Sequence, residues 1–206
     1  RGILNRVVSQ DPLPSIIATF GLSIALQNAM QQIWSADTRS IPGGGIEQAS
    51  WQIGSIFIGV LPVIVLLVAT VLTGGIDALL RFTKFGRALR ASASDVEAAA
   101  LTGINPKAVY ALATALAVGI LGFAAVFQGL RSTVAPSDGP AQLIYAFEAV
   151  IIGGMGSIWG AFLGSMVLGV SQAIGFRINP GFGLLAGHLV FLAVLAFRPQ
   201  GIFGRS

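Results

Sequence analysis

The chain of 206 residues contains no cysteine, a single histidine and few charged side chains. Without cysteine it has neither a disulfide framework nor a thiolate that binds a metal or attacks a substrate. Charged residues make up 10% of the sequence, whereas soluble domains contain about 25%. A soluble fold of this length needs more charge to cover its surface. The composition therefore excludes an ordinary soluble domain.

Hydrophobic residues, in contrast, make up 54% of the chain and fall in long runs without a charged side chain. About 20 such residues cross roughly 30 Å of hydrocarbon as a helix. The net charge of +4 comes from basic residues between these runs, which favours a membrane over nucleic acid as their partner surface. We therefore predict an all-α, polytopic transmembrane helical bundle with about six spans. The predicted spans are 13–34, 53–75, 107–130, 140–157, 159–176 and 182–197. Because the chain starts at Arg1 without methionine or a signal-peptide pattern, we also expect N-terminal truncation.

The segment 76–106 between the second and third spans is rich in lysine and arginine. The positive-inside rule places such a segment in the cytoplasm. The loops 37–47 and 131–138 then face outward.

The stretch 139–176 has a glycine-rich centre and one acidic residue. We interpret it as two spans, because two crossings return Arg198 and Arg205 to the cytoplasm. A re-entrant segment that is buried in protein is the alternative.

A short cytoplasmic helix at 95–102 is predicted from its end signals. Ser94 and Glu97 have the spacing of a capping box, and Asp95 adds a negative charge to the first turn. Gly103 is suited to end the helix in a left-handed conformation.

Asn105 and Pro106 suit the N-cap and first position of the next helix. A helix as short as 95–102 is marginal in water and needs a partner surface. We expect it to dock on another subunit, with Arg87 and Arg90 meeting acidic residues or lipid headgroups; an ordinary solvated loop is the alternative.

Three separated motifs lie between residues 86 and 204. They are Gly86-Arg87-Ala88-Leu89-Arg90-Ala91 with Glu97-Ala98-Ala99 and Leu101-Thr102-Gly103-Ile104-Asn105, then Ala146-Phe147-Glu148-Ala149-Val150-Ile151-Ile152-Gly153-Gly154-Met155-Gly156-Ser157-Ile158-Trp159-Gly160-Ala161, and finally Arg198-Pro199-Gln200-Gly201-Ile202-Phe203-Gly204. Their content and order resemble the permeases of the branched-chain amino acid ABC importer family, over most of 85–204. Residues 1–75 match only as generic membrane helices. The chain departs from the family pattern at Trp159, where proline is more usual, and at Glu148, where a small or apolar residue is usual.

This resemblance implies a multi-pass subunit of the bacterial inner membrane that transports and is not an enzyme. Its implied partners are a second permease, two cytoplasmic ATPase subunits and an external substrate-binding protein. The chain itself is expected to bind no cofactor or metal, with ATP and magnesium held by the ATPase subunits, and it contains no G-x-x-x-x-G-K-[ST] motif. The residues implied in coupling to the ATPase are Gly86, Arg87, Arg90, Ser94, Asp95, Glu97, Ala98, Ala99, Gly103 and Asn105.

Glu148 is the one acidic residue flanked by apolar sequence, and such intramembrane groups are functional candidates. We assign it to the translocation path, with a solvated position near the outer interface as the alternative. Asn28 and Gln128 are further path candidates, with a hydrogen-bonded seam between helices as the alternative; the position of Asn28 favours the seam, and nothing decides for Gln128.

Small residues that let helix backbones approach closely recur in the second motif. The predicted helix-packing positions are Gly153, Gly154, Gly156, Gly160 and Gly164.

Two alternative functions remain open. A passive channel or secondary transporter is compatible with the spans, but inverted repeats or a partnered intramembrane charge pair would favour it and the sequence shows neither. An intramembrane serine protease would use Ser157 and His188, but Ser157 is followed by Ile158 instead of the glycine of the rhomboid pattern. A lone histidine is otherwise a poor metal site, and we expect His188 to be packed and hydrogen-bonded.

Overall fold

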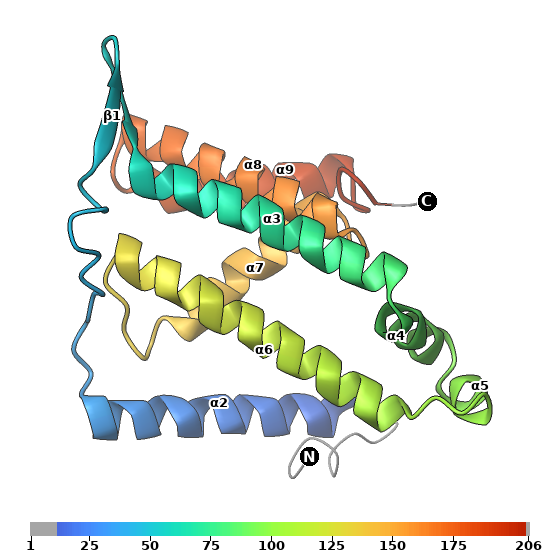
Figure 1. Cartoon of the computed structure of the whole chain (residues 1–206). Helices are drawn as coiled ribbons and strands as arrows, with labels where there is room; N and C mark the ends of the chain where they lie inside the picture. Colours follow the sequence, from blue (N-terminus) through green and yellow to red (C-terminus); the bar gives the residue numbers. More distant parts are fainter. Residues whose placement is uncertain (1–11, 205–206) are drawn as a thin grey trace. The chain divides into compact units, whose positions relative to one another are not determined.

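The computed structural model describes residues 12–204, which form eight helices and one β-hairpin (Figure 1). In chain order the elements are α2 (Pro12–Trp34), β1 (Ser50–Ile53), β2 (Ile56–Gly59), α3 (Val60–Phe82), α4 (Lys84–Ser94), α5 (Val96–Leu101), α6 (Pro106–Arg131), α7 (Gly139–Gly153), α8 (Ile158–Ile178) and α9 (Phe182–Phe197). By length and composition, α3, α6 and α8 are able to cross a membrane, while α7 and α9 are apolar but shorter. The predicted helical membrane architecture is confirmed.

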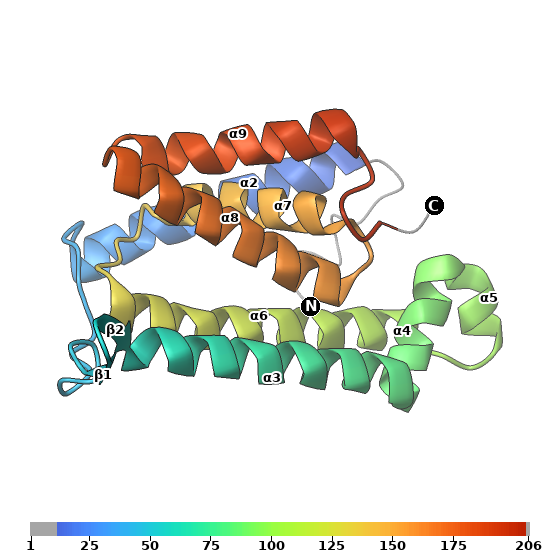
Figure 2. The ribbon, with the colours of Figure 1, turned by 90° about the horizontal axis from the view of Figure 1, so that it is seen from above.

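The chain divides into two compact units. One contains α2, the hairpin, α4, α5 and α6 with both ends of α3, and the other contains α7, α8, α9 and the C-terminal tail with Leu66–Ala78 of α3. Within the second unit, α8 packs against both α7 and α9 (Figure 2). Arg1 and Arg205, on which the truncation and topology predictions drew, lie outside the described residues.

In the first unit, the two loops predicted to share a side of the membrane are paired with each other. The Arg39 amide donates to the Val134 carbonyl at 2.9 Å, and the Val134 amide donates to the Arg39 carbonyl at 2.7 Å. The loops 37–47 and 131–138 therefore lie at the same end of the unit, as predicted. Which side of the membrane they face stays a prediction.

The predicted span 53–75 does not coincide with one helix, and its membrane boundaries stay a prediction. Its first residues belong to an antiparallel hairpin in which Trp51 lies opposite Ile58, and α3 begins only at Val60 and continues to Phe82. Gly54, with a φ of 64°, occupies the first position of the two-residue turn, where a left-handed conformation favours glycine. Hydropathy does not separate the two structures, because β-branched and aromatic residues satisfy an apolar window and also favour strands.

The predicted interruption of 139–176 is confirmed. Helix α7 ends at Gly153 and α8 starts at Ile158, and between them Gly154 and Gly156 adopt φ values of 97° and 88°. With 15 residues, α7 is about 22 Å long, which is shorter than roughly 30 Å of hydrocarbon. The count of six spans therefore stays a prediction, with α7 compatible with a re-entrant element.

Candidate functional site

The segment 76–106, which the sequence predicts to be a cytoplasmic coupling loop, contains two helices, α4 and α5, where the sequence predicted one. Thr83 separates α4 from the end of α3, because its hydroxyl donates to the Leu79 carbonyl at 2.6 Å and accepts from the Gly86 amide at 3.2 Å. The predicted helix at 95–102 corresponds to α5, which spans Val96–Leu101.

The N-cap of α5 is Asp95, and the predicted capping role of Ser94 is wrong. The Asp95 carboxylate accepts from the amides of Glu97 at 2.9 Å and Ala98 at 3.0 Å. Ser94 is the last residue of α4, and its hydroxyl donates to the Arg90 carbonyl at 3.1 Å. Because α4 continues through Ser94, the first residue with the extended backbone of an N-cap is Asp95, whose φ is −154°.

The predicted end of α5 and start of α6 are both confirmed. Gly103 has a φ of 85° and follows the C-cap, and the Ile104 amide returns to the Ala99 carbonyl at 3.2 Å. The Asn105 side chain accepts from the Ala108 amide at 3.2 Å and caps α6.

Gly86, Arg87 and Arg90 fasten α4 to the C-terminal end of α3. A Cβ on Gly86 would lie 2.0 Å from the Leu80 carbonyl oxygen. The Arg90 guanidinium donates to that same carbonyl, and the Arg87 guanidinium reaches the Phe82 carbonyl at 3.5 Å. Cationic groups at a helix C-terminus also interact favourably with its dipole. Among the described residues, the contacts of these two arginines are thus backbone carbonyls rather than acidic side chains.

Helix α5 presents apolar side chains outward. Leu101 is 90% exposed and Val96 is 48% exposed, whereas Ala99 is 4% exposed. Glu97 and Ala98 are also exposed. A helix of six residues with exposed apolar side chains is marginal in water and gains stability from a partner. This surface is suited to docking.

We expect Asp95→Ala to destabilise α5 by about 1 kcal/mol, because it removes the acceptor for two amides. Exchange of the Glu97 and Ala98 amides with solvent deuterium should then accelerate by about fivefold. Ser94→Ala is the matched control and should leave these amides unchanged. Equal acceleration in both variants would contradict the assignment of the cap.

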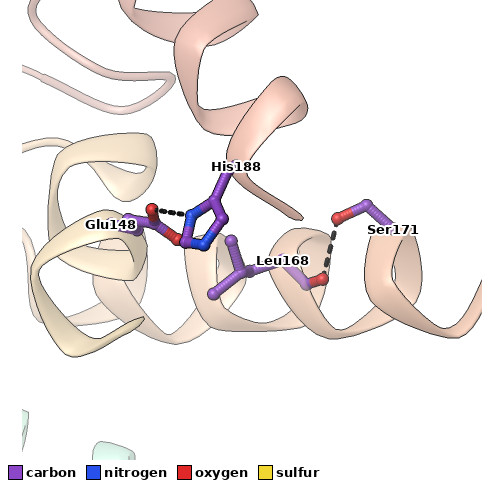
Figure 3. Close-up of polar contacts among 4 residues, drawn as sticks. All are labelled: Glu148, Leu168, Ser171 and His188. Atoms are coloured by element: carbon purple, nitrogen blue, oxygen red, sulfur yellow. Dashed lines mark hydrogen bonds and ion pairs between the residues drawn. The ribbon is translucent and has the colours of Figure 1, made fainter. Parts of the chain in front are cut away.

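A second cluster lies in the other unit, where Glu148 of α7 meets His188 of α9 (Figure 3). Glu148 Oε1 lies 2.5 Å from His188 Nδ1. Glu148 is 5% exposed, while 42% of the His188 side chain is exposed. The Tyr145 ring, one turn before Glu148, stacks on the imidazole with ring centroids 6.0 Å apart. The cluster therefore joins α7 to α9 through a charged or charge-assisted contact.

Only one carboxylate oxygen of Glu148 has a partner. Glu148 Oε2 is buried without a hydrogen bond, although buried carboxylates usually find several donors. The nearby Ser171 hydroxyl donates to the Leu168 carbonyl of its own helix at 2.7 Å (Figure 3). The alternative in which Glu148 is solvated near the interface does not fit this burial.

The sequence did not indicate this pair, because its members are 40 positions apart. No partnered pair was seen in the sequence, whereas the structure pairs Glu148 with His188, and the expectation of a hydrogen-bonded His188 is confirmed. A usable signal existed: Glu148 and His188 are each a lone ionisable group in an apolar helix, and such groups tend to pair.

Ser157 and His188 do not form a dyad within the described part of the chain. The Ser157 hydroxyl accepts from the Gly160 amide at 2.9 Å and caps α8, and the Nδ1 atom of His188 is engaged by Glu148. Of the described residues, no group of three or more carboxylate or imidazole side chains is arranged to hold a metal ion.

Three of the five predicted packing glycines hold α7 against α8. A Cβ on Gly153 would lie 2.0 Å from the Gly160 carbonyl oxygen, and one on Gly164 would lie 2.1 Å from the Ala149 carbonyl oxygen. Gly160 itself is buried and faces the Gly153 carbonyl. These backbones approach too closely for any side chain.

Gly154 and Gly156 have other roles, because they lie in the break and not in a helix. At Gly154 a Cβ would meet the Gly204 amide nitrogen at 2.5 Å, while at Gly156 there is open space and only the positive φ favours glycine. The prediction of helix packing is wrong for these two positions.

The C-terminal motif docks on the same break. The Ile202 amide donates to the Ile152 carbonyl at 2.8 Å, and the Phe203 amide donates to the Gly153 carbonyl at 3.1 Å. These two carbonyls end α7 and have no intrahelical partner. The second and third sequence motifs therefore form one structural element.

The other two path candidates are bonded within their own segments. The Asn28 amide donates to the Ile24 carbonyl at 3.0 Å, and the Gln128 amide donates to the Ser132 hydroxyl at 3.0 Å. Both side chains belong to exposed residues. Their place in a translocation path stays a prediction.

A known protein family matches nearly the whole chain. The sequence profile of the family described as branched-chain amino acid transport system / permease component matches residues 2–196. The match includes the N-terminal part, which motifs alone assigned only to generic membrane helices. No solved structure matches the chain.

Individual curated proteins are similar as well. The high-affinity branched-chain amino acid transport system permease protein BraD of Pseudomonas aeruginosa is 32% identical over 201 residues, covering 92% of this chain and 64% of BraD. LivH of Escherichia coli is 28% identical over 200 residues, covering 94% of this chain and 64% of LivH. LivM of the same organism is 30% identical over 129 residues, covering 62% of this chain and 30% of LivM. The chain thus spans 64% of the length of BraD and LivH.

Proposed function

Because the chain belongs to the family of branched-chain amino acid transport permease components, we propose that it is the permease subunit of an ATP-driven importer for branched-chain or related amino acids. In this proposal it forms half of the translocation path in a bacterial inner membrane. A second permease supplies the other half, an external binding protein delivers the substrate, and two cytoplasmic ATPase subunits hold ATP and magnesium. The similarity to both LivH and LivM supports a paired permease.

The observation that carries the proposal is the geometry of α5. The helix is capped at both ends, α4 is fastened to the end of α3, and Leu101 and Val96 face outward. The Tyr110 hydroxyl also donates to the Ser92 carbonyl at 2.7 Å, which ties α6 to α4. A force on α5 is thereby passed to two long helices, α3 and α6. This is the mechanical connection that coupling to an ATPase requires.

Leu101→Asp should abolish stable co-purification of the ATPase subunit, because it places a charge in the centre of the proposed contact. The variant should fold normally, since Leu101 is 90% exposed. Lys107→Gln, which removes a charge just beyond α5, is the control and should retain the ATPase. Undiminished co-purification with Leu101→Asp would remove α5 from the coupling role.

The Glu148–His188 pair favours a second candidate, a secondary transporter, since such pairs serve as ion or proton sites. Family membership favours the importer, and in the importer we place Glu148 in the translocation path with His188 as its positioning residue. The two candidates differ in their energy source. Substrate accumulation that requires ATP supports the importer, and accumulation driven by an ion gradient without ATP supports the alternative.

A further inference from the structure

The apolar sequence that precedes Asp77 is longer than the helix that it forms. Residues 48–76 contain no charged side chain, yet α3 begins only at Val60. The helical part, 60–76, is about 26 Å long at about 1.5 Å per residue, whereas the hydrocarbon layer is roughly 30 Å thick. The predicted cytoplasmic loop starts at 76, and with Asp77 and Arg81 at that boundary of the membrane the N-terminal end of α3 lies near the level of the opposite one.

The hairpin β1–β2 continues directly from this end of α3 (Figure 1). Strand β2 ends at Gly59 and α3 starts at Val60 without a linker, and the Val60 amide donates to the Ala49 carbonyl at 2.9 Å. The hairpin is therefore held against the N-terminal end of α3.

The hairpin exposes large apolar and aromatic side chains beside the uncharged polar residues Ser50, Gln52 and Ser55. Trp51 is 53% exposed, Phe57 67% and Ile58 37%, and the segment 50–59 has no charged residue. A two-stranded hairpin is at best marginally stable in water. These exposed side chains need an apolar environment to contribute to its stability.

Two properties of the hairpin determine how deep in the membrane it can lie. Its outer edges carry unpaired amide and carbonyl groups, which hydrocarbon does not tolerate. Its aromatic side chains favour removal from bulk water, and tryptophan is enriched at the level of the lipid headgroups. The headgroup region satisfies both requirements, because it offers water to the edges and acyl chains to the rings.

We infer that the hairpin 50–59 is an interfacial anchor that lies in the lipid leaflet at the N-terminal end of α3, with Trp51 at headgroup depth. Lipids of the bilayer cover its exposed apolar side chains. An uncharged surface continuous with a membrane-crossing helix fits lipid better than it fits a soluble protein, whose interfaces usually have a polar rim. The inference concerns membrane placement and holds whether or not transport uses ATP.

The test is depth-dependent quenching of Trp51 fluorescence in lipid vesicles. The chain has three tryptophans, and with Trp34→Phe and Trp159→Phe only Trp51 remains. The complete transporter is reconstituted in phosphatidylcholine and phosphatidylglycerol vesicles that carry bromine either near the headgroup or near the chain end, and aqueous iodide is the opposing quencher. Matched controls, in the background with Trp51→Phe, are Leu67→Trp within α3 and Val96→Trp on α5, the latter in vesicles that lack the ATPase subunits, where α5 is exposed to water.

We expect bromine near the headgroup to quench Trp51 more strongly than bromine near the chain end, and iodide to quench it less than the α5 control. Iodide quenching equal to that control would place the hairpin in water and overturn the inference. Stronger quenching near the chain end would overturn the headgroup depth. Protection from both quenchers would mean that a protein covers the hairpin, either a second permease or, if protection requires its addition, the binding protein.

A spin label provides a second measurement if the single-tryptophan variant does not fold. The chain has no cysteine of its own, so Phe57→Cys is labelled directly. Dissolved oxygen should relax this label more effectively than a water-soluble nickel chelate. The reverse order would overturn the inference without any change to the tryptophans.

Discussion

Gly153→Ala is expected to disrupt the packing of α7 on α8 and to lower the free energy of unfolding by about 3 kcal/mol or more. The added Cβ would lie 2.0 Å from the Gly160 carbonyl oxygen and 2.2 Å from its carbonyl carbon. Neither atom belongs to a side chain that rotates away, so one helix must move. Because the tail also bonds to the Gly153 carbonyl, the displacement should release it as well.

Thermal unfolding in detergent, followed by loss of the monodisperse peak in size-exclusion chromatography, measures this effect. Gly169→Ala is the matched control on α8, because a Cβ there meets nothing within 4 Å. Alanine is favoured over glycine in a helix by about 1 kcal/mol, so the control should be neutral or stabilising. Equal melting temperatures for the two variants would contradict the close approach of α7 and α8.

Glu148→Gln is expected to lower the initial rate of substrate uptake about tenfold, which corresponds to about 1.4 kcal/mol in the barrier. Glutamine keeps the size of the side chain and an oxygen that accepts from His188 Nδ1, but it removes the charge. Assembly should therefore be retained while the electrostatic role is lost. The measurement is uptake of labelled substrate by the reconstituted transporter, with its amount in the membrane determined in parallel.

Two further variants separate the role of the pair from general damage. Ser171→Ala removes a nearby hydroxyl that bonds only to the Leu168 carbonyl, and it should leave uptake unchanged. His188→Gln combined with Glu148→Gln should cost less than the sum of the two single changes, since residues in one network are not additive. Unchanged uptake in Glu148→Gln would remove Glu148 from the mechanism, and additive losses would remove His188 as its positioning residue.

The sequence predicted most helices well because membrane helices are set by length and by the absence of charge. Segments 107–130 and 182–197 differ from α6 and α9 by at most one residue at each end. The difference at 53–75 has a physical cause, since hydropathy reports where apolar residues are and not how their backbone is bonded. The β-branched and aromatic residues before Val60, with Gly54 between them, were the available signal for a hairpin.

Helix caps could be predicted where one residue bonds backbone groups only a few positions away. Gly103 and Asn105 act as predicted, because a left-handed cap and an N-cap depend on a few consecutive residues. The capping role predicted for Ser94 was wrong because no local signal indicated α4, which is held by contacts to α3 and α6. Once α4 is present, Asp95 is the first residue free to cap α5.

The motifs did not predict contacts between residues far apart in the sequence. The pairing of Glu148 with His188 and the docking of Ile202 on Ile152 depend on how α7, α8 and α9 pack. The glycine motif indicated close packing but not its partner, so it did not distinguish Gly153, which contacts α8, from Gly154, which contacts the tail.

Leucine uptake into vesicles that contain the complete transporter tests most directly whether this chain is the permease of an ATP-driven importer. The external binding protein is supplied with labelled leucine, and ATP is placed on the side of the ATPase subunits. Accumulation should require both ATP and the binding protein and should be lost in Leu101→Asp. Accumulation that persists without ATP and follows an imposed ion gradient would contradict the importer function.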